Sequence, residues 1–285
     1  MNDDKAFIEI DLKRRANVIR QHIVKMIGKA GSGHPGGSLS AADIITVLFF
    51  DEMNIDVTNP KWTDRDRFVL CKGHSAPALY AALAEKGFFD IKELDNLRKL
   101  GSMLQGHPDM NSTPGVDMST GSLGQGLSVA NGMAISAKMD KKDYRVYALL
   151  GDGEIEEGQV WEAAMMSSHR KLDNLVAIID NNGLQIDGDV FDVKSLKDIA
   201  GKFKSFGWNV IEIDGHDILQ IKDALKQARN TFGMPTAIVA KTIKGKGVSF
   251  MENQAGWHGT APKPDQVELA IRELDAEIEK VGANK

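Results

Sequence analysis

The sequence predicts an α/β fold in which a parallel sheet is flanked by helices on both faces. Short apolar runs recur along the chain, and stretches with helical periodicity separate them. The clearest case is a run at 144–150, then a helix, then a second run at 175–179. Because a crossover through a helix joins parallel strands, this repeated alternation indicates a parallel sheet.

Polar residues follow both strands of this central unit. The first run stops at Gly151-Asp152-Gly153, and the second leads into Asn181-Asn182. Ligands collect beyond the carboxyl ends of the strands in doubly wound sheets, so we expect Asp152 and Asn182 at one edge. A carboxylate and an amide carbonyl are hard oxygen ligands, which suit Mg²⁺ bound together with phosphates. The unit therefore predicts half of a metal site for a diphosphate.

Residues 1–100 are expected to contain four helices and one strand. Apolar residues spaced three and four apart indicate an amphipathic helix at 7–28, which a glycine-dense loop at 28–37 ends. Ser40 is the expected N-cap of a helix at 41–50. Residues 67–71 form the first expected strand, and helices are expected at 77–86 and 91–100.

A long segment without expected secondary structure occupies residues 101–121. Loops of that length inside a compact protein are uncommon and are often functional. The segment leads into Gly121-Ser122-Leu123-Gly124, at the start of a helix with many small residues. These glycines are explained either by tight helix packing or by backbone amides that face an anion or a ligand ring.

The carboxyl-terminal part continues the alternation. Residues 208–213 and 235–241 are the last expected strands, and Asp217 is expected to cap a helix at 218–231. A loop rich in glycine and lysine follows at 241–264, and a final helix is expected at 265–281. Since we find no internal repeat or linker, we expect residues 1–285 to form one domain.

The composition argues against several classes of protein. A formal net charge of −5 is not that of a general nucleic-acid binder, which needs a basic face. The single cysteine, Cys71, excludes an internal disulfide framework and is typical of a reducing compartment. The charged amino-terminal residues and the short apolar segment at 44–50 predict neither a signal peptide nor a membrane span. We expect a soluble, cytoplasmic protein.

Four of the seven histidines lie beside glycine in expected loops: His34, His74, His107 and His258. A lone histidine in a loop is usually only an exposed polar side chain, and this is the simplest interpretation of any one of them. Their repetition favours a shared ligand, because glycine allows close approach and imidazole can donate, accept or carry charge near neutral pH. Zinc is the alternative, but ligand spacings typical of zinc are absent, which favours an anionic or polyhydroxylated ligand.

Four acidic residues open the helix after Gly153: Glu154, Glu156, Glu157 and Glu162. Carboxylates in the first turn of a helix complement its dipole, so the residues alone assign them no chemistry. Three lysines lie near the last loop: Lys241, Lys244 and Lys246. For at least two of them we prefer a solvated surface position to phosphate binding.

A Gly-Asp-Gly alone is a weak signal, because Asp-Gly turns are common. Followed after a helix and a strand by Asn181-Asn182, it resembles the diphosphate and metal motif of thiamine diphosphate enzymes. Further segments resemble, in order, the amino-terminal portion of transketolase, and the resemblance covers essentially the whole chain. They are SGHPGGSLS at 32–40, KGHSAPALY at 72–80, GHPD at 106–109, TGSLGQGLSVANGMA at 120–134, IDGH at 213–216 and GWHGTAP at 256–262.

The resemblance implies the thiamine-diphosphate-binding fold and a set of cofactor contacts. Mg²⁺, with Ca²⁺ or Mn²⁺ as substitutes, would be coordinated by Asp152, Asn182 and the carbonyl of Leu184. The amide of Gly153 and the imidazoles of His74 and His258 would contact the diphosphate. The aminopyrimidine or thiazolium ring would lie against Gly121, Ser122 and Leu123.

The resemblance also implies catalytic residues. His34, His107 and His258 would face the substrate, and Glu157 would belong to a carboxylate network that crosses a subunit interface. The reaction would transfer a two-carbon ketol unit from a ketose phosphate to an aldose phosphate, as in the pentose phosphate pathway. Such a protein would have sugar phosphates as its ligands and no nucleic acid or membrane as a partner.

A complete transketolase has a second region, which carries the glutamate that activates the pyrimidine ring and the arginines that hold the sugar phosphate. The sequence ends shortly after the first region. The resemblance is therefore to the amino-terminal subunit of a split transketolase, whose carboxy-terminal subunit would be a separate chain in an α2β2 assembly. On this basis we expect the chain alone to bind cofactor weakly and not to turn over.

Three alternatives stay open at the level of the sequence. Two share the chemistry: the α subunit of a 2-oxo-acid dehydrogenase, and a deoxyxylulose-phosphate synthase-like protein. The recurring glycine-histidine segments favour the sugar-transferring branch, since 2-oxo acids have fewer hydroxyls to hold. The third is a non-catalytic subunit that binds thiamine diphosphate and has only a regulatory role.

Overall fold

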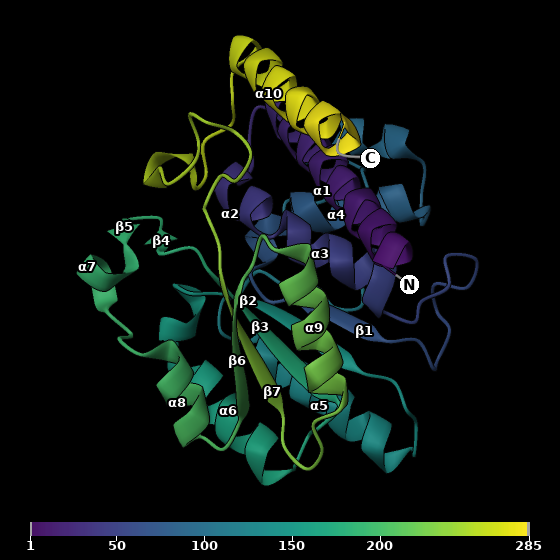
Figure 1. Cartoon of the computed structure of the whole chain (residues 1–285), viewed down its shortest axis with the longest axis vertical. Helices are drawn as coiled ribbons and strands as arrows, with labels where there is room; N and C mark the ends of the chain where they lie inside the picture. Colours follow the sequence, from purple (N-terminus) through teal and green to yellow (C-terminus); the bar gives the residue numbers. More distant parts are fainter. Residues whose placement is uncertain (1, 284–285) are drawn as a thin grey trace.

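The computed structural model describes residues 2–283 and places five parallel strands in one sheet (Figure 1). In order across the sheet they are β1 (Arg67–Leu70), β2 (Val146–Gly151), β3 (Leu175–Asn181), β7 (Thr236–Lys241) and β6 (Asn209–Asp214). Helices cover both faces of this sheet. The predicted fold class is confirmed.

Alternate side chains of each strand enter two separate cores, because successive residues of a strand point to opposite faces. Tyr147 and Ile178 belong to the core on one face, and Ala148 and Ile179 to the core on the other. Helices that contribute to the first core include α1 (Asn2–Ala30), α3 (Ala42–Val47), α4 (Ala76–Lys86), α9 (Ile218–Arg229) and α10 (Pro264–Ala283). The second core contains residues of α5 (Gly126–Met139), α6 (Gly158–His169) and α8 (Ile199–Ser205). Burial of both faces explains why the strands are continuous apolar runs.

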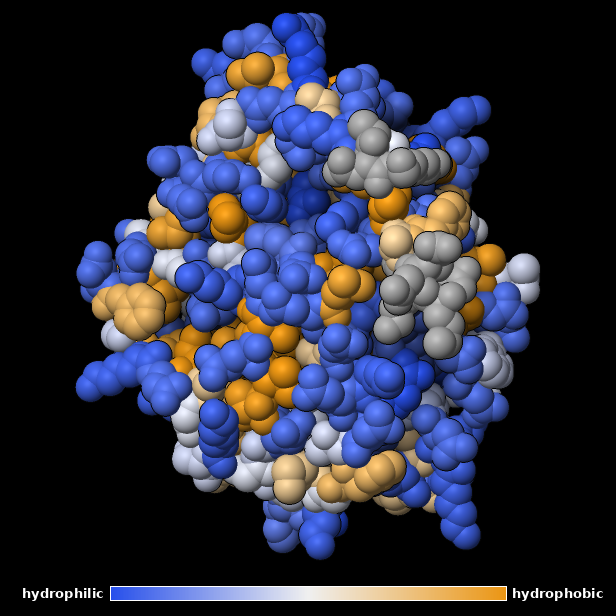
Figure 2. Space-filling model, in the orientation of Figure 1, coloured by the Kyte–Doolittle hydropathy of each residue, from blue (hydrophilic) through white to orange (hydrophobic). Residues whose placement is uncertain are grey.

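Helices α1 and α10 lie side by side along the top of the molecule in Figure 1. Within residues 2–283 no helix is long and apolar enough to cross a bilayer. The face seen in Figure 2 is mostly hydrophilic, and the apolar side chains on it gather mainly in one central area.

The prediction that Ser40 caps a helix was wrong. Ser40 is the last residue of a short buried helix, α2 (Pro35–Ser40), and α3 begins two residues later with Ala41 as its N-cap. Pro35 at the first position favours this helix within the expected glycine loop. The Ser40 hydroxyl instead donates to Asp180 at 2.6 Å, so a tertiary partner replaces the expected local one.

Two other segments differ from the prediction. The helix expected at 91–100 is a shorter 3-10 turn, η3 (Ile91–Asn96). The region after β3, for which we predicted no element before residue 208, contains a hairpin of β4 (Leu184–Gln185) and β5 (Gly188–Asp189), followed by α7 (Val190–Lys194) and α8. Elements this short show no periodicity, although the N-caps Asp189 and Asp198 were visible signals.

A buried ionic network joins α1 to α3 and to the segment after β6. The Asp43 carboxylate accepts hydrogen bonds from both terminal nitrogens of Arg20 and, at 2.7 Å, from Nδ1 of His216. His216 in turn accepts the backbone N–H of Ile243 at 2.8 Å. Burial opposes ionisation, but the guanidinium of Arg20 and the hydrogen bond from His216 outweigh it and lower the pKa of Asp43.

We expect Asp43→Ala to destabilise the chain by about 3–5 kcal/mol, because Arg20 would be left buried without its carboxylate. The pKa of Asp43 is lower in the folded chain than in the unfolded chain. Its contribution to the free energy of unfolding is therefore fully present above the ordinary carboxyl pKa of about 3.9, and it is lost as the pH falls towards the pKa of the folded state. Urea unfolding at pH 7 and at pH 3 measures both effects. Asp51→Asn, which removes a more exposed pair with Lys222, is the control and should cost no more than about 1 kcal/mol.

Candidate functional site: a polar cavity at the carboxyl edge of the sheet

The carboxyl ends of neighbouring strands meet at one edge of the sheet. Gly151 of β2 lies opposite Asp180 of β3, and Asn181 of β3 lies opposite Lys241 of β7. The residues that follow these strands therefore emerge together. This register brings Asp152, Asn182 and the loop after β7 into one place.

A cavity of about 290 Å³ lies at this edge. Its lining includes ten of the twelve site residues predicted from the sequence: His34, His74, Gly121, Leu123, Asp152, Gly153, Glu157, Asn182, Leu184 and His258. Four larger hollows of the described chain, of about 470, 770, 610 and 510 Å³, contain none of the twelve. The chemistry of the lining, and not the volume, therefore selects the site.

The other two predicted residues, His107 and Ser122, are exposed and are not part of this lining. His107 lies against Gly121, where a Cβ atom would come within 2.9 Å of the imidazole carbon Cδ2. Only glycine leaves room for this contact, and its φ of 150° lies in a region that side chains rarely adopt. His107 therefore flanks the cavity rim next to Gly121.

Asp152 is a buried carboxylate, 2% exposed, at the base of the cavity. Its two oxygens accept the backbone N–H groups of Gly153 at 2.9 Å and Gly183 at 2.5 Å. Burial and then the nearby charge of Asp180 raise the pKa of Asp152 to about 6. Two neighbouring buried carboxylates favour a cation between or beside them.

The carbonyl of Leu184 already holds a cation. The Lys244 ammonium donates to it at 2.9 Å and lies 3.0 Å from Nδ1 of His258. Beside it, the Asn182 amide oxygen accepts the N–H of Leu184 at 3.1 Å, while the amide nitrogen donates to Asp180 at 3.3 Å. Carboxylate, amide oxygen and carbonyl are the donors that Mg²⁺ prefers, so these residues fit that ion.

The described residues contain no cluster of three histidine, cysteine, aspartate or glutamate side chains able to hold a metal. The donor set at this cavity includes an amide and a backbone carbonyl, which such a cluster would not contain. The site therefore suits a hard cation that shares its coordination sphere with a ligand, and not a closed structural zinc.

Two glycines in the cavity lining allow neighbouring side chains to pack close to the backbone. A Cβ atom at Gly37 would lie 3.0 Å from Ser75 Oγ, and one at Gly153 would lie 3.0 Å from Gln185 Oε1. The hydroxyls of Ser75 and Thr120 are buried and have no hydrogen-bond partner in the described chain. Neither residue is part of the cavity lining, so these hydroxyls do not identify a ligand.

Three of the histidines form a cluster. The ring centroids of His34 and His74 are 5.1 Å apart, those of His74 and His258 are 5.1 Å apart, and those of His34 and His258 are 5.6 Å apart. Burial and positive neighbours lower the pKa of His34 to about 4 and that of His258 to about 3. The rings are therefore neutral at pH 7, so each can donate one proton and accept another.

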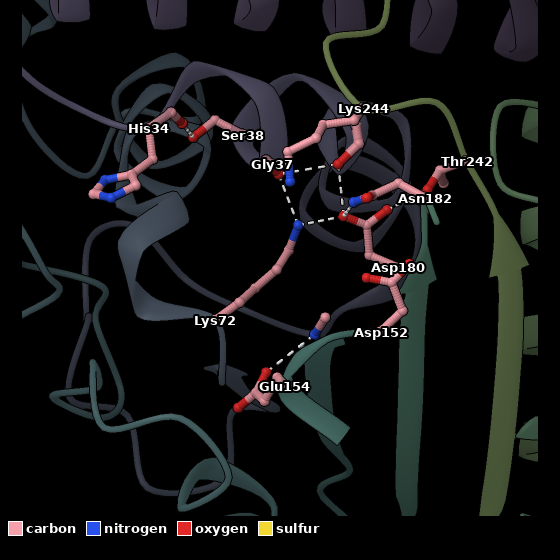
Figure 3. Close-up of polar contacts among 12 residues, drawn as sticks. His34, Gly37, Ser38, Lys72, Asp152, Glu154, Asp180, Asn182, Thr242 and Lys244 are labelled. Atoms are coloured by element: carbon pink, nitrogen blue, oxygen red, sulfur yellow. Dashed lines mark hydrogen bonds and ion pairs between the residues drawn. The ribbon is translucent and has the colours of Figure 1, made fainter. Parts of the chain in front are cut away.

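A buried hub beneath the cavity was not predicted from the sequence. The fully buried Asp180 accepts hydrogen bonds from Lys72 and Thr242, which are labelled in Figure 3. It also accepts one from Ser40, so three other segments of the chain meet at this carboxylate. Lys72 also donates to the carbonyl of Gly37 at 2.7 Å. The sequence did contain one indication of this network, since Asp180 is an ionisable residue at the end of an otherwise apolar strand. Lys244 also had no individual role in the prediction, yet it is 2% exposed and not solvated.

The acidic residues after Gly153 separate into different environments. Glu154 is buried, and its carboxylate accepts the N–H of Gly124 at 3.1 Å and that of Gly151 at 3.0 Å. It therefore connects the loop before α5 to the end of β2, which a helix-dipole role does not explain. Burial raises its pKa to about 7. Glu157 lies exposed at the start of α6, on the rim of the cavity.

Comparison with known proteins agrees with this geometry. Residues 12–281 match the family described as "Transketolase, thiamine diphosphate binding domain". The chain is 48% identical to a 6-deoxy-6-sulfo-D-fructose transketolase subunit, SqwG, from Clostridium sp. (strain MSTE9), over 94% of this chain and 98% of that protein. It is 46% identical to one of the subunits of an apulose-4-phosphate transketolase from Phocaeicola vulgatus, over 92% of this chain and 93% of that protein.

Longer transketolases match over part of their length only. Human transketolase is 46% identical over 94% of this chain but 42% of its own length. The crystal structure of transketolase from Campylobacter jejuni has a TM-score of 0.87 and 33% identity, and the match covers 95% of this chain and 45% of that one. The chain thus matches two transketolase subunits over nearly their whole length and undivided transketolases over less than half of theirs. It belongs to the transketolase family, as an amino-terminal, thiamine diphosphate-binding subunit of a split transketolase.

Proposed function

We propose that residues 1–285 form one domain that holds the diphosphate and the divalent cation of thiamine diphosphate for ketol transfer between sugars. The observation that carries this proposal is the meeting, in one cavity, of the Asp152 carboxylate and the Leu184 carbonyl with three neutral histidines. Asp152, Asn182 and Leu184 would hold Mg²⁺. His74, His258 and the amide of Gly153 would contact the diphosphate, and Gly121, Ser122 and Leu123 would lie against the cofactor rings.

When bound, the cofactor supplies the carbon nucleophile that cleaves and re-forms the bond next to a ketose carbonyl. The residues of the chain orient the sugar and move protons. His34, His107 and His258 would donate to the carbonyl oxygen as negative charge develops on it and would take up protons from sugar hydroxyls. Neutral imidazoles suit both tasks at pH 7, because each ring has one donor and one acceptor.

The substrate would be a ketose with an anionic group remote from the reacting carbons. The names of two relatives specify such sugars, one with a sulfo group and one with a phosphate. Since the cavity described above holds the cofactor end of the reaction, the anionic group of the sugar would be bound by a second subunit. That partner would carry the pyrimidine-activating glutamate and meet Glu157, in an α2β2 complex in the cytoplasm, where buried Cys71 remains a thiol.

The test is reconstitution. The chain and the product of its neighbouring gene are purified separately and assayed, alone and mixed, with a ketose phosphate or a sulfo-ketose as donor and an aldose phosphate as acceptor. We expect two-carbon transfer only in the mixture, with thiamine diphosphate and Mg²⁺ present. Consumption of pyruvate or another 2-oxo acid in place of the ketose would contradict the proposal, and so would full activity of the chain alone.

Lys244 lines the cavity, and when Mg²⁺ takes the Leu184 carbonyl its ammonium would be free to donate to the diphosphate. We therefore expect Lys244→Met to weaken binding of thiamine diphosphate about 10–100-fold, because hydrogen bonds of a charged group contribute about 1.5–3 kcal/mol. Burial, followed by the charge of Lys72, lowers the pKa of Lys244 to about 8, so it is still a cation at pH 7. Calorimetric titration of the reconstituted complex measures the change. Lys246→Met is the control, since Lys246 lies two residues after Lys244 in the same loop and pairs with Glu252. An equal loss in both variants would indicate a general charge effect and no specific contact.

A further inference from the structure

Arg98 lies directly behind His34, one of the proposed substrate-facing residues. It follows η3 in a left-handed backbone conformation with φ of 61°, and its N–H donates to the carbonyl of Leu104 at 2.8 Å. Its guanidinium donates to Ser32 Oγ at 3.2 Å, and Nη2 lies 3.4 Å from Nδ1 of His34. A guanidinium has N–H donors and no acceptor, so Nδ1 of His34 must be the acceptor in this contact.

This contact fixes which ring nitrogen of His34 carries the proton. A neutral imidazole has one N–H and one acceptor, so accepting at Nδ1 places the proton on Nε2. Nε2 is on the opposite side of the ring from Arg98, where a Cβ atom at Gly259 would come within 3.5 Å of it. Gly259 follows His258, whose ring lines the same cavity. His34 therefore presents a donor, and not an acceptor, on that side.

The groups around His34 are cationic or neutral. Arg98 approaches from the loop after η3, and His107 from the loop at 101–121. Lys244 and His258 approach from the loop after β7. His74, in the 3-10 turn η2 (Gly73–Ser75), packs against the His34 ring. After burial, the charge of Arg98 is the largest cause of the lowered pKa of His34, and the same charge lowers the pKa of His107. Arg98 thus favours the neutral form of two proposed catalytic imidazoles.

We propose that Arg98 is a positioning residue for ketol transfer, which holds His34 in its Nε2–H tautomer so that the ring donates to the substrate oxygen. This inference rests on the function proposed above. It gives Arg98 no contact with the sugar or the cofactor. The competing explanation is structural, because the Arg98 guanidinium also lies against Gly106, where a Cβ atom would meet Nε at 3.1 Å, and could serve only to brace that loop.

The first test needs neither the partner nor activity. Two-bond ¹H–¹⁵N correlation spectra of the full chain at pH 7.5 distinguish the two histidine tautomers. We expect His34 as the Nε2–H form in the unsubstituted chain and as a mixture in Arg98→Met, which keeps the length of the side chain but removes its donors and charge. An Nδ1–H form in the unsubstituted chain would overturn the proposal. This measurement gives a result even if the complex shows no ketol transfer, so it separates failure of this inference from failure of the proposed function.

The second test uses the reconstituted complex. Arg98→Met should move the acid limb of the kcat/KM profile to higher pH, because His34 becomes easier to protonate, and should lower kcat at pH 7.5 about tenfold or more. Arg98→Lys should return the acid limb to its original pH, because that limb depends on the positive charge. It should recover less of kcat, because lysine does not reproduce the contact of the guanidinium with Nδ1 of His34. Lys99→Met is the matched control, since Lys99 is the exposed neighbour of Arg98 and its ammonium donates to Asn96 and not to a histidine. If Arg98→Met lowers thermal stability while tautomer, pH profile and kcat stay unchanged, Arg98 is only a brace and the proposal is wrong.

Discussion

Replacement of Asp152 by asparagine should remove metal-dependent binding of thiamine diphosphate and, with it, ketol transfer. Asp152 is the carboxylate of the proposed donor set; the other two donors, the Asn182 amide and the Leu184 carbonyl, are uncharged. Substitutions in the shell behind metal ligands lower affinity about 10–100-fold, so loss of an anionic ligand should exceed about 100-fold. Calorimetric titration of the complex with cofactor, at several Mg²⁺ concentrations, measures the effect.

A nearby carboxylate provides the control for Asp152. Asp187 lies exposed in the turn between β4 and β5, a few residues from Leu184, and carries the same charge. Asp187→Asn should leave cofactor affinity within about twofold, since charges in water interact weakly. Retained activity in Asp152→Asn would show that the metal is bound elsewhere. Metal-dependent cofactor binding without activity in the unsubstituted complex would indicate a non-catalytic subunit.

Replacement of Asp180 by alanine should affect both the fold and the site. The Lys72 ammonium would be left buried without its carboxylate, which destabilises a protein by about 3–5 kcal/mol. The Thr242 hydroxyl would lose its acceptor, the Ser40 hydroxyl would keep only the Gly37 carbonyl, and the Asn182 amide would lose the partner that orients it. We therefore expect a lower midpoint of urea unfolding and weaker Mg²⁺-dependent cofactor binding in the folded fraction.

The double variant Asp180→Ala with Lys72→Met tests the cause. Removing both charges should recover much of the lost stability, because replacing a buried ion pair by apolar side chains is often neutral. The orientation of Asn182 would remain unsupported, so cofactor binding should recover less. Asp64→Ala, which breaks a largely exposed pair with Lys142, is the surface control and should cost no more than about 1 kcal/mol. Equal losses for Asp64 and Asp180 would contradict the role of a buried hub.

Local patterns were enough to predict the sheet and its functional edge. The strands are apolar runs with turn residues at their ends, and parallel strands bring those ends together, so the convergence of Asp152 and Asn182 followed from order alone. Four histidines, His34, His74, His107 and His258, were grouped because each lies beside glycine in a loop. The structure places three of the rings in one cluster, and the fourth, His107, is exposed and outside the cavity lining.

Long-range pairings could not be predicted in this way. Lys72 and Asp180 are 108 residues apart, and Ser40 and Asp180 are 140 apart, so no local signal joins them. Ser40 was expected to cap a helix because serine does so in isolation, but the buried carboxylate of Asp180 offers it a stronger acceptor. The position of Lys244 was missed for the same reason: whether a loop lysine is solvated or buried depends on what the loop packs against.

The position of the metal tests the proposed site most directly. Crystals of the reconstituted complex with thiamine diphosphate and Mn²⁺ would reveal the ion by its anomalous scattering. We predict one peak at about 2.0–2.2 Å from the Asp152 carboxylate, the Asn182 amide oxygen and the Leu184 carbonyl, the range of such oxygen ligands. We also predict that Lys244 is then displaced from Leu184. A peak among the rings of His34, His74 and His258, or none in this cavity, would contradict the proposed site.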